Sequence, residues 1–366
     1  MKTAWQSLEE RLESRQPPEL VLRLGPKLAP LLDPTTDGGF YTRVVTGLAA
    51  WSRDWGIPVP ETSFTPGHDL PSNVYQIEVD GRIEARGESN AVGVLVVGSP
   101  ATTQVLLGVE TNDPIYHLPA KWISATQATR AHELGCVVFD PAGLMTAHLL
   151  EVLGRMPDRM INLDSLSPRL DRLSERYPVL SEEVERRLDR VEVVTLFRQL
   201  AREKVAVGDL KTVFEAVVTA VSPDEDNHDS VLDRVRSELG RHICRPYLGD
   251  DGYLGVATLT KSFEQQLKER MEEGHLPSDD GEEFLHSLSL ELDPLLEQAP
   301  FLALVVDFEL RSLVRALTDL RYGHVPILAW PELPPEASVE VLLEIGCRLH
   351  PRARPIPRNR FKIERD

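Results

Sequence analysis

The clearest candidate for a binding function in this sequence is a carboxylate placed three residues before an aromatic side chain. Asp113 and Pro114 precede Tyr116, and His117 follows it directly. A half-exposed tyrosine beside a carboxylate suits partner binding, because aromatic side chains that fill pockets dominate the energy of protein interfaces. The alternative is structural, since Asx-Pro pairs are frequent in turns: Asp113 would cap the turn before Pro114, and Tyr116 would fill the core.

No catalytic motif stands out. The sequence contains no P-loop, G-x-G-x-x-G, H-E-x-x-H, G-x-S-x-G or C-x-x-C segment. His148 falls on the apolar side of a helical pattern, which indicates a hydrogen-bonded core histidine rather than a catalytic base. Two acidic clusters lack the glycine and terminal glutamate of an EF-hand and are interpreted as solvated loops: Asp224, Glu225, Asp226 and Asp229, and then Asp279, Asp280, Glu282 and Glu283. We therefore expect neither a metal nor a cofactor.

Residues 112–153 contain the elements that must position these side chains. Asp113-Pro114 and Leu118-Pro119 are turn signals on either side of Ile115 and Tyr116. The apolar run 136–139 predicts a buried strand. Asp140 and Pro141 then predict a helix start, as N-cap and first helical residue. The apolar face of that helix is expected to contain Leu144, Met145, His148, Leu149, Val152 and Leu153.

The rest of the pattern predicts an α+β protein. Strands are expected at residues 20–25, 75–79, 82–86, 92–97, 253–259, 302–306, 325–330 and 339–345, with 105–108 as a further candidate. Helices are expected at residues 41–55, 164–176, 179–189, 191–203, 209–221, 229–243, 261–273 and 310–320. Asp80-Gly81 predicts a two-residue hairpin, and 274–282 a polar loop. The strand, helix, strand order across 302–330 implies a parallel crossover.

Charge and cysteine content limit the possible functions. The 366 residues include 58 acidic and 40 basic side chains, and the net charge of −18 argues against a nucleic-acid partner. Cys136, Cys244 and Cys347 are far apart among apolar neighbours, which indicates buried thiols in a reducing compartment. The sequence contains neither a window of roughly 18 apolar residues nor an apolar signal core, so a cytosolic protein is expected.

Residues 348–366 form a basic segment in which Pro351, Pro355 and Pro357 favour an extended chain. We interpret it as a solvated tail. The alternative is a docking peptide for the acidic surface of a neighbouring subunit.

Several segments carry a family resemblance, and they occur in the family's order. They are L-P-S-N-x-Y-Q-I-E-V-D-G-R-I-E-A-R-G at 70–87, D-P-x-Y-x-L-P-A-x-W-I at 113–123, A-H-L-x-E-V-L at 147–153, L-A-R-E-K-V-A-V-G-D-L-K-T-V-F-E-A at 200–216 and V-P-I-L-A-W-P-E-L-P-P-E-A-S-V-E-V at 325–341. Together they resemble the cytoplasmic domain of the FHIPEP family, the large export-gate subunits of flagellar and type III secretion systems.

The resemblance implies four subdomains between a linker or arm at 1–18 and the basic tail at 348–366. A first α/β module would span 19–86 and resume at 130–155, around a β-rich insertion at 87–129. A helical module would span 156–247, and a C-terminal α/β module with a βαβ crossover 248–347.

The resemblance also implies a function. The chain would form a ring, a nonamer in the family, that docks chaperone–cargo complexes, passes cargo to the export channel and contacts other apparatus proteins such as the ATPase stalk. Asp113 and Tyr116 would line a docking groove between the first module and the insertion. The other expected partner-binding residues are His117, Trp122, Ala147 and His148. His117 replaces a glycine of the family, and Ala147 replaces a groove threonine, which puts the identity of the chaperone in doubt.

Two other functions remain open at this stage. The membrane-spanning half that precedes this region in the family is not in the sequence, so the chain could be a free-standing gate-like paralogue acting as a regulator or adaptor. It could also be an enzyme with an unrecognised site. If joined to or docked on a membrane half, it would lie in the cytoplasm at the inner face of the bacterial inner membrane.

Overall fold

The computed structural model of the chain describes residues 19–33, 39–222, 231–249, 252–272, 278–296 and 302–346. These residues form two compact units. Unit 1 contains the described residues up to Glu175, together with Arg190–Arg202 and Ala206–Asp209. Unit 2 contains Arg176–Asp189, Glu203–Val205 and the described residues from Leu210 onwards. The predicted mixture of helices and sheets is confirmed in both.

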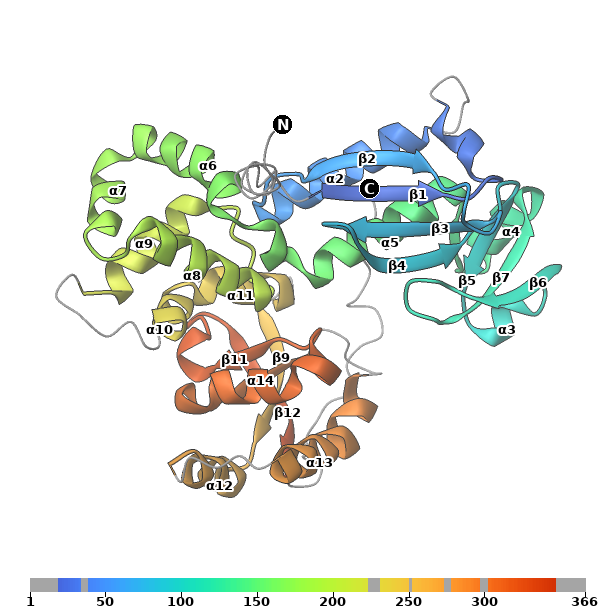
Figure 1. The fold of residues 1–366 in the computed structure, drawn as a ribbon. Coiled ribbons are helices and arrows are strands. Elements are labelled where there is room, and N and C mark those ends of the chain that lie inside the picture. The colour runs from blue at the N-terminus through green and yellow to red at the C-terminus, as the bar shows by residue number, and fades with distance from the viewer. Residues whose placement is uncertain are drawn as a thin grey trace. The chain divides into compact units, whose positions relative to one another are not determined.

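The first sheet of unit 1 has the strand order β2-β1-β3-β4 (Figure 1). Its strands are β1 (Glu19–Leu24), β2 (Glu61–Pro66), β3 (Val74–Val79) and β4 (Arg82–Glu88). The chain crosses from β1 to the parallel strand β2 through α2 (Phe40–Trp55), whose buried residues recur at helical spacing. Asp80 and Gly81 both have positive φ angles, 51° and 72°, which confirms the predicted two-residue hairpin between β3 and β4.

The second sheet of unit 1 is antiparallel, with the order β6-β7-β5-β8. Its strands are β5 (Gly93–Val97), β6 (Gly108–Asn112), β7 (Pro119–Ser124) and β8 (Val137–Phe139). The candidate strand at 105–108 is wrong, because the chain is still turning at Val105 and the strand begins only at Gly108. A Cβ at Gly108 would lie 2.1 Å from the carbonyl oxygen of Trp122, so only glycine allows the close approach of β6 to β7.

Unit 1 contains five helices besides α2 among the described residues. They are α3 (Pro100–Thr103), α4 (Ala128–Glu133), α5 (Pro141–Arg155), α8 (Arg190–Arg202) and α6 (Leu163–Arg176, whose last residue belongs to unit 2). The start of α5 is confirmed, since the Asp140 carboxylate accepts the Gly143 N–H at 2.7 Å. Leu144 of α5 packs with Leu95, Ile115 and Ala120 in one apolar cluster, which joins α5 to the second sheet.

Unit 2 is built on an all-parallel sheet with the order β11-β10-β9-β12. Its strands are β9 (Tyr253–Leu259), β10 (Ala303–Val306), β11 (Ile327–Ala329) and β12 (Ser338–Ile345). The predicted crossover is confirmed, because β10 and β11 are parallel and flank α14 (Arg311–Tyr322). Both faces of a parallel sheet are usually covered, and its strands here are correspondingly apolar.

The remaining helices of unit 2 differ from the sequence prediction at two places. They are α7 (Pro178–Glu185), α9 (Leu210–Ala220), α10 (Val231–Glu238), α11 (Gly240–Cys244), α12 (Lys261–Glu272) and α13 (Ser278–Leu296). The expected loop at 274–282 is wrong from Ser278 onwards, where α13 begins; serine and acidic residues are as typical of helix starts as of loops. The expected helix at 229–243 is divided into α10 and α11, with Gly240 against the backbone of Glu332.

Short 3-10 turns complete both units and stand at the ends of the longer elements. They are Ala29–Leu32, Ala125–Gln127, Pro157–Met160, Arg245–Tyr247, Phe308–Leu310 and Trp330–Glu332. The acidic cluster at 224–229, Cys347 and the basic tail lie outside the described residues, as does the arm at 1–18.

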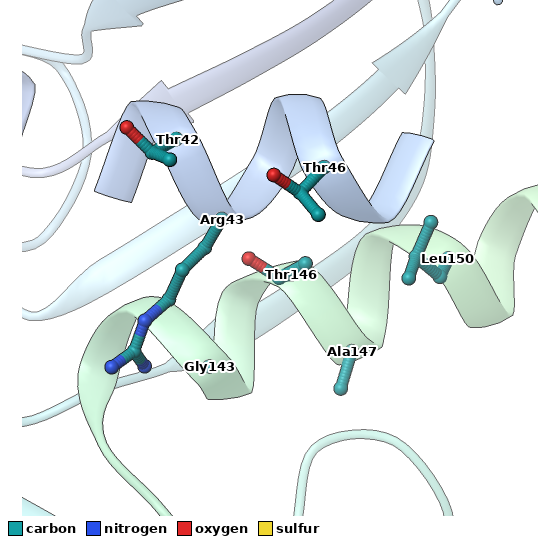
Figure 2. Close-up of a pocket in the computed structure, with 7 residues that line it drawn as sticks. All are labelled: Thr42, Arg43, Thr46, Gly143, Thr146, Ala147 and Leu150. Carbon is teal, nitrogen blue, oxygen red and sulfur yellow. The ribbon is translucent and has the colours of Figure 1, made fainter. Parts of the chain in front are cut away.

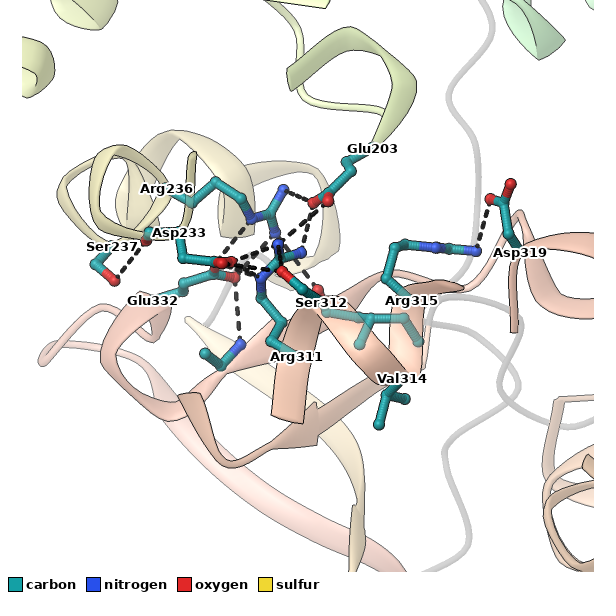
Figure 3. A network of polar contacts seen from close by, with 12 residues as sticks. Glu203, Asp233, Arg236, Ser237, Arg311, Ser312, Val314, Arg315, Asp319 and Glu332 are labelled. Atoms are coloured by element: carbon teal, nitrogen blue, oxygen red, sulfur yellow. Dashed lines mark hydrogen bonds and ion pairs between the residues drawn. The ribbon is translucent and has the colours of Figure 1, made fainter. Parts of the chain in front are cut away.

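A buried ionic network holds the helices of unit 2 together (Figure 3). Arg236 of α10 donates two hydrogen bonds to the carboxylate of Glu332, at 2.8 and 3.0 Å. Arg311 of α14 binds Glu203 and Asp233, each at 2.5 Å. The side chains of Arg236, Arg311 and Glu332 are no more than 2% exposed. The network therefore joins α10, α14 and the turn at Trp330–Glu332 through side chains that are largely or fully buried.

We expect Arg311→Ala to lower the free energy of unfolding by about 3–5 kcal/mol, because the buried carboxylates of Glu203 and Asp233 lose a cation. The matched control is Arg321→Ala on the same helix, whose ion pair with Asp293 is about half exposed on each side and should contribute little to stability. Urea denaturation of both variants provides the measurement. Equal losses in the two variants would contradict the importance assigned to the network.

Candidate partner-binding site

The loop between β6 and β7 is folded around the carboxylate of Asp113. One carboxylate oxygen accepts the N–H groups of Ile115 at 2.8 Å and Tyr116 at 3.1 Å, and the other accepts that of Leu118 at 2.9 Å. The backbone closes the same loop, since the Asp113 N–H binds the Leu118 carbonyl and the His117 N–H binds the Asp113 carbonyl. Asp113 is only 3% exposed. Its carboxylate therefore organises the loop, as the structural alternative from the sequence predicts.

Tyr116 projects from this loop with 60% of its surface exposed, so it does not fill the core. Its hydroxyl donates a hydrogen bond to the carboxylate of Glu151 in α5 at 2.8 Å. Partial burial and this hydrogen bond to a carboxylate raise the pKa of Tyr116 to about 12. The ring is therefore held in one position against α5 and remains accessible.

Glu151 and Arg155 complete the attachment of the loop to α5, although the sequence did not single them out. Arg155 donates to Glu151 at 3.3 Å and to the carbonyl oxygen of Ile115 at 3.1 Å. The sequence did contain an indication that Glu151 belongs to the site. It stands three residues after His148, which is one turn along the same helix.

The other expected site residues lie at different depths. His117 is exposed and has a φ of 57°, a left-handed conformation that favours glycine. Trp122 and Ala147 are half-buried and pack against the apolar cluster that contains Ile115 and Leu144. These two residues therefore lie beneath the loop and support it from β7 and α5.

His148 lies in the core, 2% exposed, as the sequence predicts. Its Nδ1 is 2.8 Å from the Tyr75 hydroxyl, and the two rings meet edge to face. Burial, reinforced by the charge of Arg155, lowers the pKa of His148 to about 4, so the ring is neutral at pH 7. Burial and the charge of Asp113 raise the pKa of Tyr75. His148 therefore supports the site from below and is not itself a contact surface.

A surface pocket of about 420 Å³ lies between α2 and α5 (Figure 2). The residues that line it are small or aliphatic apart from one arginine: Thr42, Arg43, Thr46, Gly143, Thr146, Ala147 and Leu150. Arg43 binds the Asp140 carboxylate at 2.5 Å, which fixes one end of the pocket. Ala147 is the one residue shared with the sequence prediction. The rest were missed because threonine, glycine and leucine at helical spacing form no recognisable motif.

The described residues contain neither a metal-binding cluster nor a membrane-spanning helix. Within residues 19–33, 39–222, 231–249, 252–272, 278–296 and 302–346, no group of three or more His, Cys, Asp or Glu side chains is arranged to hold a metal ion. No helix in those ranges combines the length and apolar character that a membrane span requires.

The neutral state of His148 predicts a pH dependence of stability. Its pKa is about 4 in the folded chain against about 6.5 when unfolded, so only the unfolded state is protonated between these values. The contribution is complete above pH 6.5 and is lost as the pH falls to 4, by about 3 kcal/mol in total. His148→Gln keeps a partner for Tyr75 but does not titrate. The difference in unfolding free energy between the wild type and this variant should therefore shrink by that amount from pH 7 to pH 4. The same pH dependence of the unfolding free energy in the wild type and in His148→Gln would contradict this prediction.

The sequence was compared with known proteins. The FHIPEP family profile matches residues 2–338. The flagellar biosynthesis protein FlhA of Bacillus subtilis is 27% identical over 350 residues, which cover 91% of this chain and 51% of that protein. FlhA of Borreliella burgdorferi is 25% identical, over 88% of this chain and 47% of its own length. The chain thus spans about half the length of these relatives.

Solved structures show the same fold at lower identity. The Chlamydia pneumoniae CdsV protein superimposes with a TM-score of 0.79 at 19% identity, covering 89% of this chain and 97% of that one. Nonameric EPEC SctV-C, solved by cryo-EM, gives a TM-score of 0.72 at 18% identity, with 91% and 99% covered. With a family match that extends over most of its length, this chain belongs to the FHIPEP family.

Proposed function

We propose that this chain is the cytoplasmic export-gate domain of a flagellar or injectisome type III secretion apparatus, and that it docks chaperone–cargo complexes and passes cargo to the export channel. The observation that carries the docking role is the exposed ring of Tyr116, held over α5 by Glu151. Membership of the FHIPEP family supports the wider role. The domain would act at the inner face of the bacterial inner membrane.

The geometry of the loop supports Tyr116 as a binding anchor. Three N–H bonds to Asp113 and the bond to Glu151 fix the ring before any partner arrives. Little conformational entropy would then be lost on binding, and rigid aromatic anchors are the residues that dominate interface energy. Asp113 contributes by shaping the loop, so its effect on a partner would be indirect.

The pocket between α2 and α5 supports a partner that extends beyond Tyr116. It is concave, largely apolar and lined by Ala147 and Leu150 of the same helix that holds Glu151. A helix or loop of a chaperone that covers Tyr116 could place an apolar side chain there, since grooves with a few polar groups are typical docking sites.

We further propose that the chain assembles into a ring and contacts a stalk protein. The similar domains of EPEC SctV and of EscV were solved as nonamers, and CdsV was solved in complex with CdsO. The charged helices of this chain suit such contacts. Arg186 of the α7 region pairs with Glu182 and Glu183, each at 2.6 Å, on an exposed surface.

Truncation of the aromatic anchor should weaken docking. We expect Tyr116→Ala to reduce the affinity for a cognate secretion chaperone–cargo complex by about 2 kcal/mol, roughly thirtyfold, with an unchanged thermal melt because the ring is mostly exposed. Trp330→Ala, an exposed aromatic of unit 2, is the matched control and should bind like the wild type. Isothermal titration calorimetry measures both. Unchanged binding by Tyr116→Ala would remove this loop from the docking site.

Assembly of the isolated chain should depend on salt. Contacts between exposed charged helices, residues 164–243, are weak and are screened at high ionic strength. We therefore expect light scattering at low salt to show association that rises with protein concentration and that about 0.5 M salt abolishes. A monomer at every concentration and salt, also with chaperone–cargo present, would count against the ring.

A further inference from the structure

Strand β6 is the outer strand of the second sheet in unit 1, and one of its two sides is open. The sheet order β6-β7-β5-β8 gives β6 one neighbour, β7, and among the described residues no strand pairs with its other side (Figure 1). In antiparallel pairing, alternate residues direct their N–H and C=O groups away from the paired strand. Residues 108–112 therefore offer a row of backbone groups to an added strand.

Exposed apolar side chains lie on this edge and on the chain that leads into it. Val109 of β6 is 70% exposed, and Leu107 and Val105, which precede the strand, are 81% and 64% exposed. Natural edge strands are usually protected by lysine, proline or a bulge, and an exposed apolar edge marks a place where another chain can pair. Val109 lies opposite Trp122 of β7. An added strand would therefore extend the layer that already contains Trp122.

The edge is preformed. The Gln127 side chain accepts the Leu107 N–H at 3.1 Å and donates to the Leu107 carbonyl at 2.9 Å, which fixes the chain as it enters β6. At the other end of β6 begins the loop organised by Asp113. Both ends of the strand are thus held, and pairing with it would require little rearrangement.

The charged side chains on β6 determine which kind of strand can pair with its open edge. Glu110 is 86% exposed, and its carboxylate lies 4.0 Å from the ammonium of Lys121 opposite it, which is largely buried and donates to the carbonyls of Thr103 and Leu106. A second copy that paired in the centred antiparallel register would place Glu110 against Glu110, and like charges directly opposite each other destabilise a strand pair. A basic strand would instead place a lysine or arginine opposite Glu110.

We propose that β6 is a strand-addition site for an extended, cationic polypeptide segment with alternating apolar residues. The proposal rests on the proposed function, in which the segment belongs to exported cargo. The backbone groups of residues 108–112 supply the ladder, Val109 contacts an apolar residue of the segment, and Glu110 pairs with its lysine or arginine. Because the loop with Tyr116 directly follows β6, a chaperone docked there would release its cargo beside this strand.

The probe is a fluorescein-labelled nine-residue peptide of alternating valine and lysine, titrated into the full chain with anisotropy as readout. We expect binding that Val109→Lys weakens at least tenfold and that Val92→Lys, which adds the same charge at an 86% exposed position of unit 1, leaves unchanged. Glu110→Gln should reduce the salt dependence of binding relative to the wild type. Equal weakening by Val109→Lys and Val92→Lys would overturn the proposal.

Two further measurements test the ladder itself. The same peptide with N-methyl groups on two successive central residues, which blocks both of its edges, should not bind; equal binding would overturn strand addition. Hydrogen exchange should show that the N–H groups of residues 108–112 that point away from β7 become protected only when the peptide is present, while those bonded to β7 are protected throughout. Protection of the outward N–H groups in the dilute, peptide-free chain would assign the edge to a segment of the chain itself, and protection of these groups that grows with protein concentration would assign it to a second copy. Either result overturns the proposal.

Loss of peptide binding with intact, Tyr116-dependent chaperone binding would refute strand addition alone. Loss of both would refute the proposed docking function as well.

Discussion

The carboxylate of Asp113 is nearly removed from solvent, and three backbone N–H groups take the place of its hydration. Hydrogen bonds to an ionised acceptor are among the stronger ones in proteins, and a buried charge requires them. They hold a loop that contains a left-handed histidine, His117, a conformation that a non-glycine residue adopts at a penalty of about 1 kcal/mol. The position of Tyr116 above α5 and the end of β6 both depend on this one group.

The left-handed backbone at His117 fits the glycine that the family resemblance implies at this position. The backbone of His117 has the left-handed conformation that glycine adopts easily. The histidine side chain is exposed and adds a polar surface beside the Tyr116 ring. The loop shape is thus independent of the substitution, while the chemistry that a partner meets is not.

Much of the fold could be predicted because local patterns and tertiary structure agree. Alternation predicted β3 and β4, Asp80-Gly81 predicted their turn, and helical spacing predicted α2 and α5. The start of β6 was missed because it depends on the close approach of Gly108 to Trp122, which is a tertiary contact. The start of α13 was missed because its serine and acidic residues are equally typical of a loop, although the buried Phe284, Leu288 and Leu292 recur at helical spacing. Glu151 was missed because its role exists only when the loop lies on α5.

The ionic network of unit 2 limits how the sequence of this unit can evolve. Its charged members interlock, so replacing any one of them leaves an unpaired charge in a dry environment. An apolar set of similar volume could be equally stable, but single substitutions cannot reach it without passing through a poorly folded intermediate. Positions 203, 233, 236, 311 and 332 are therefore constrained to evolve jointly, while the exposed pairs on neighbouring helices are free to drift.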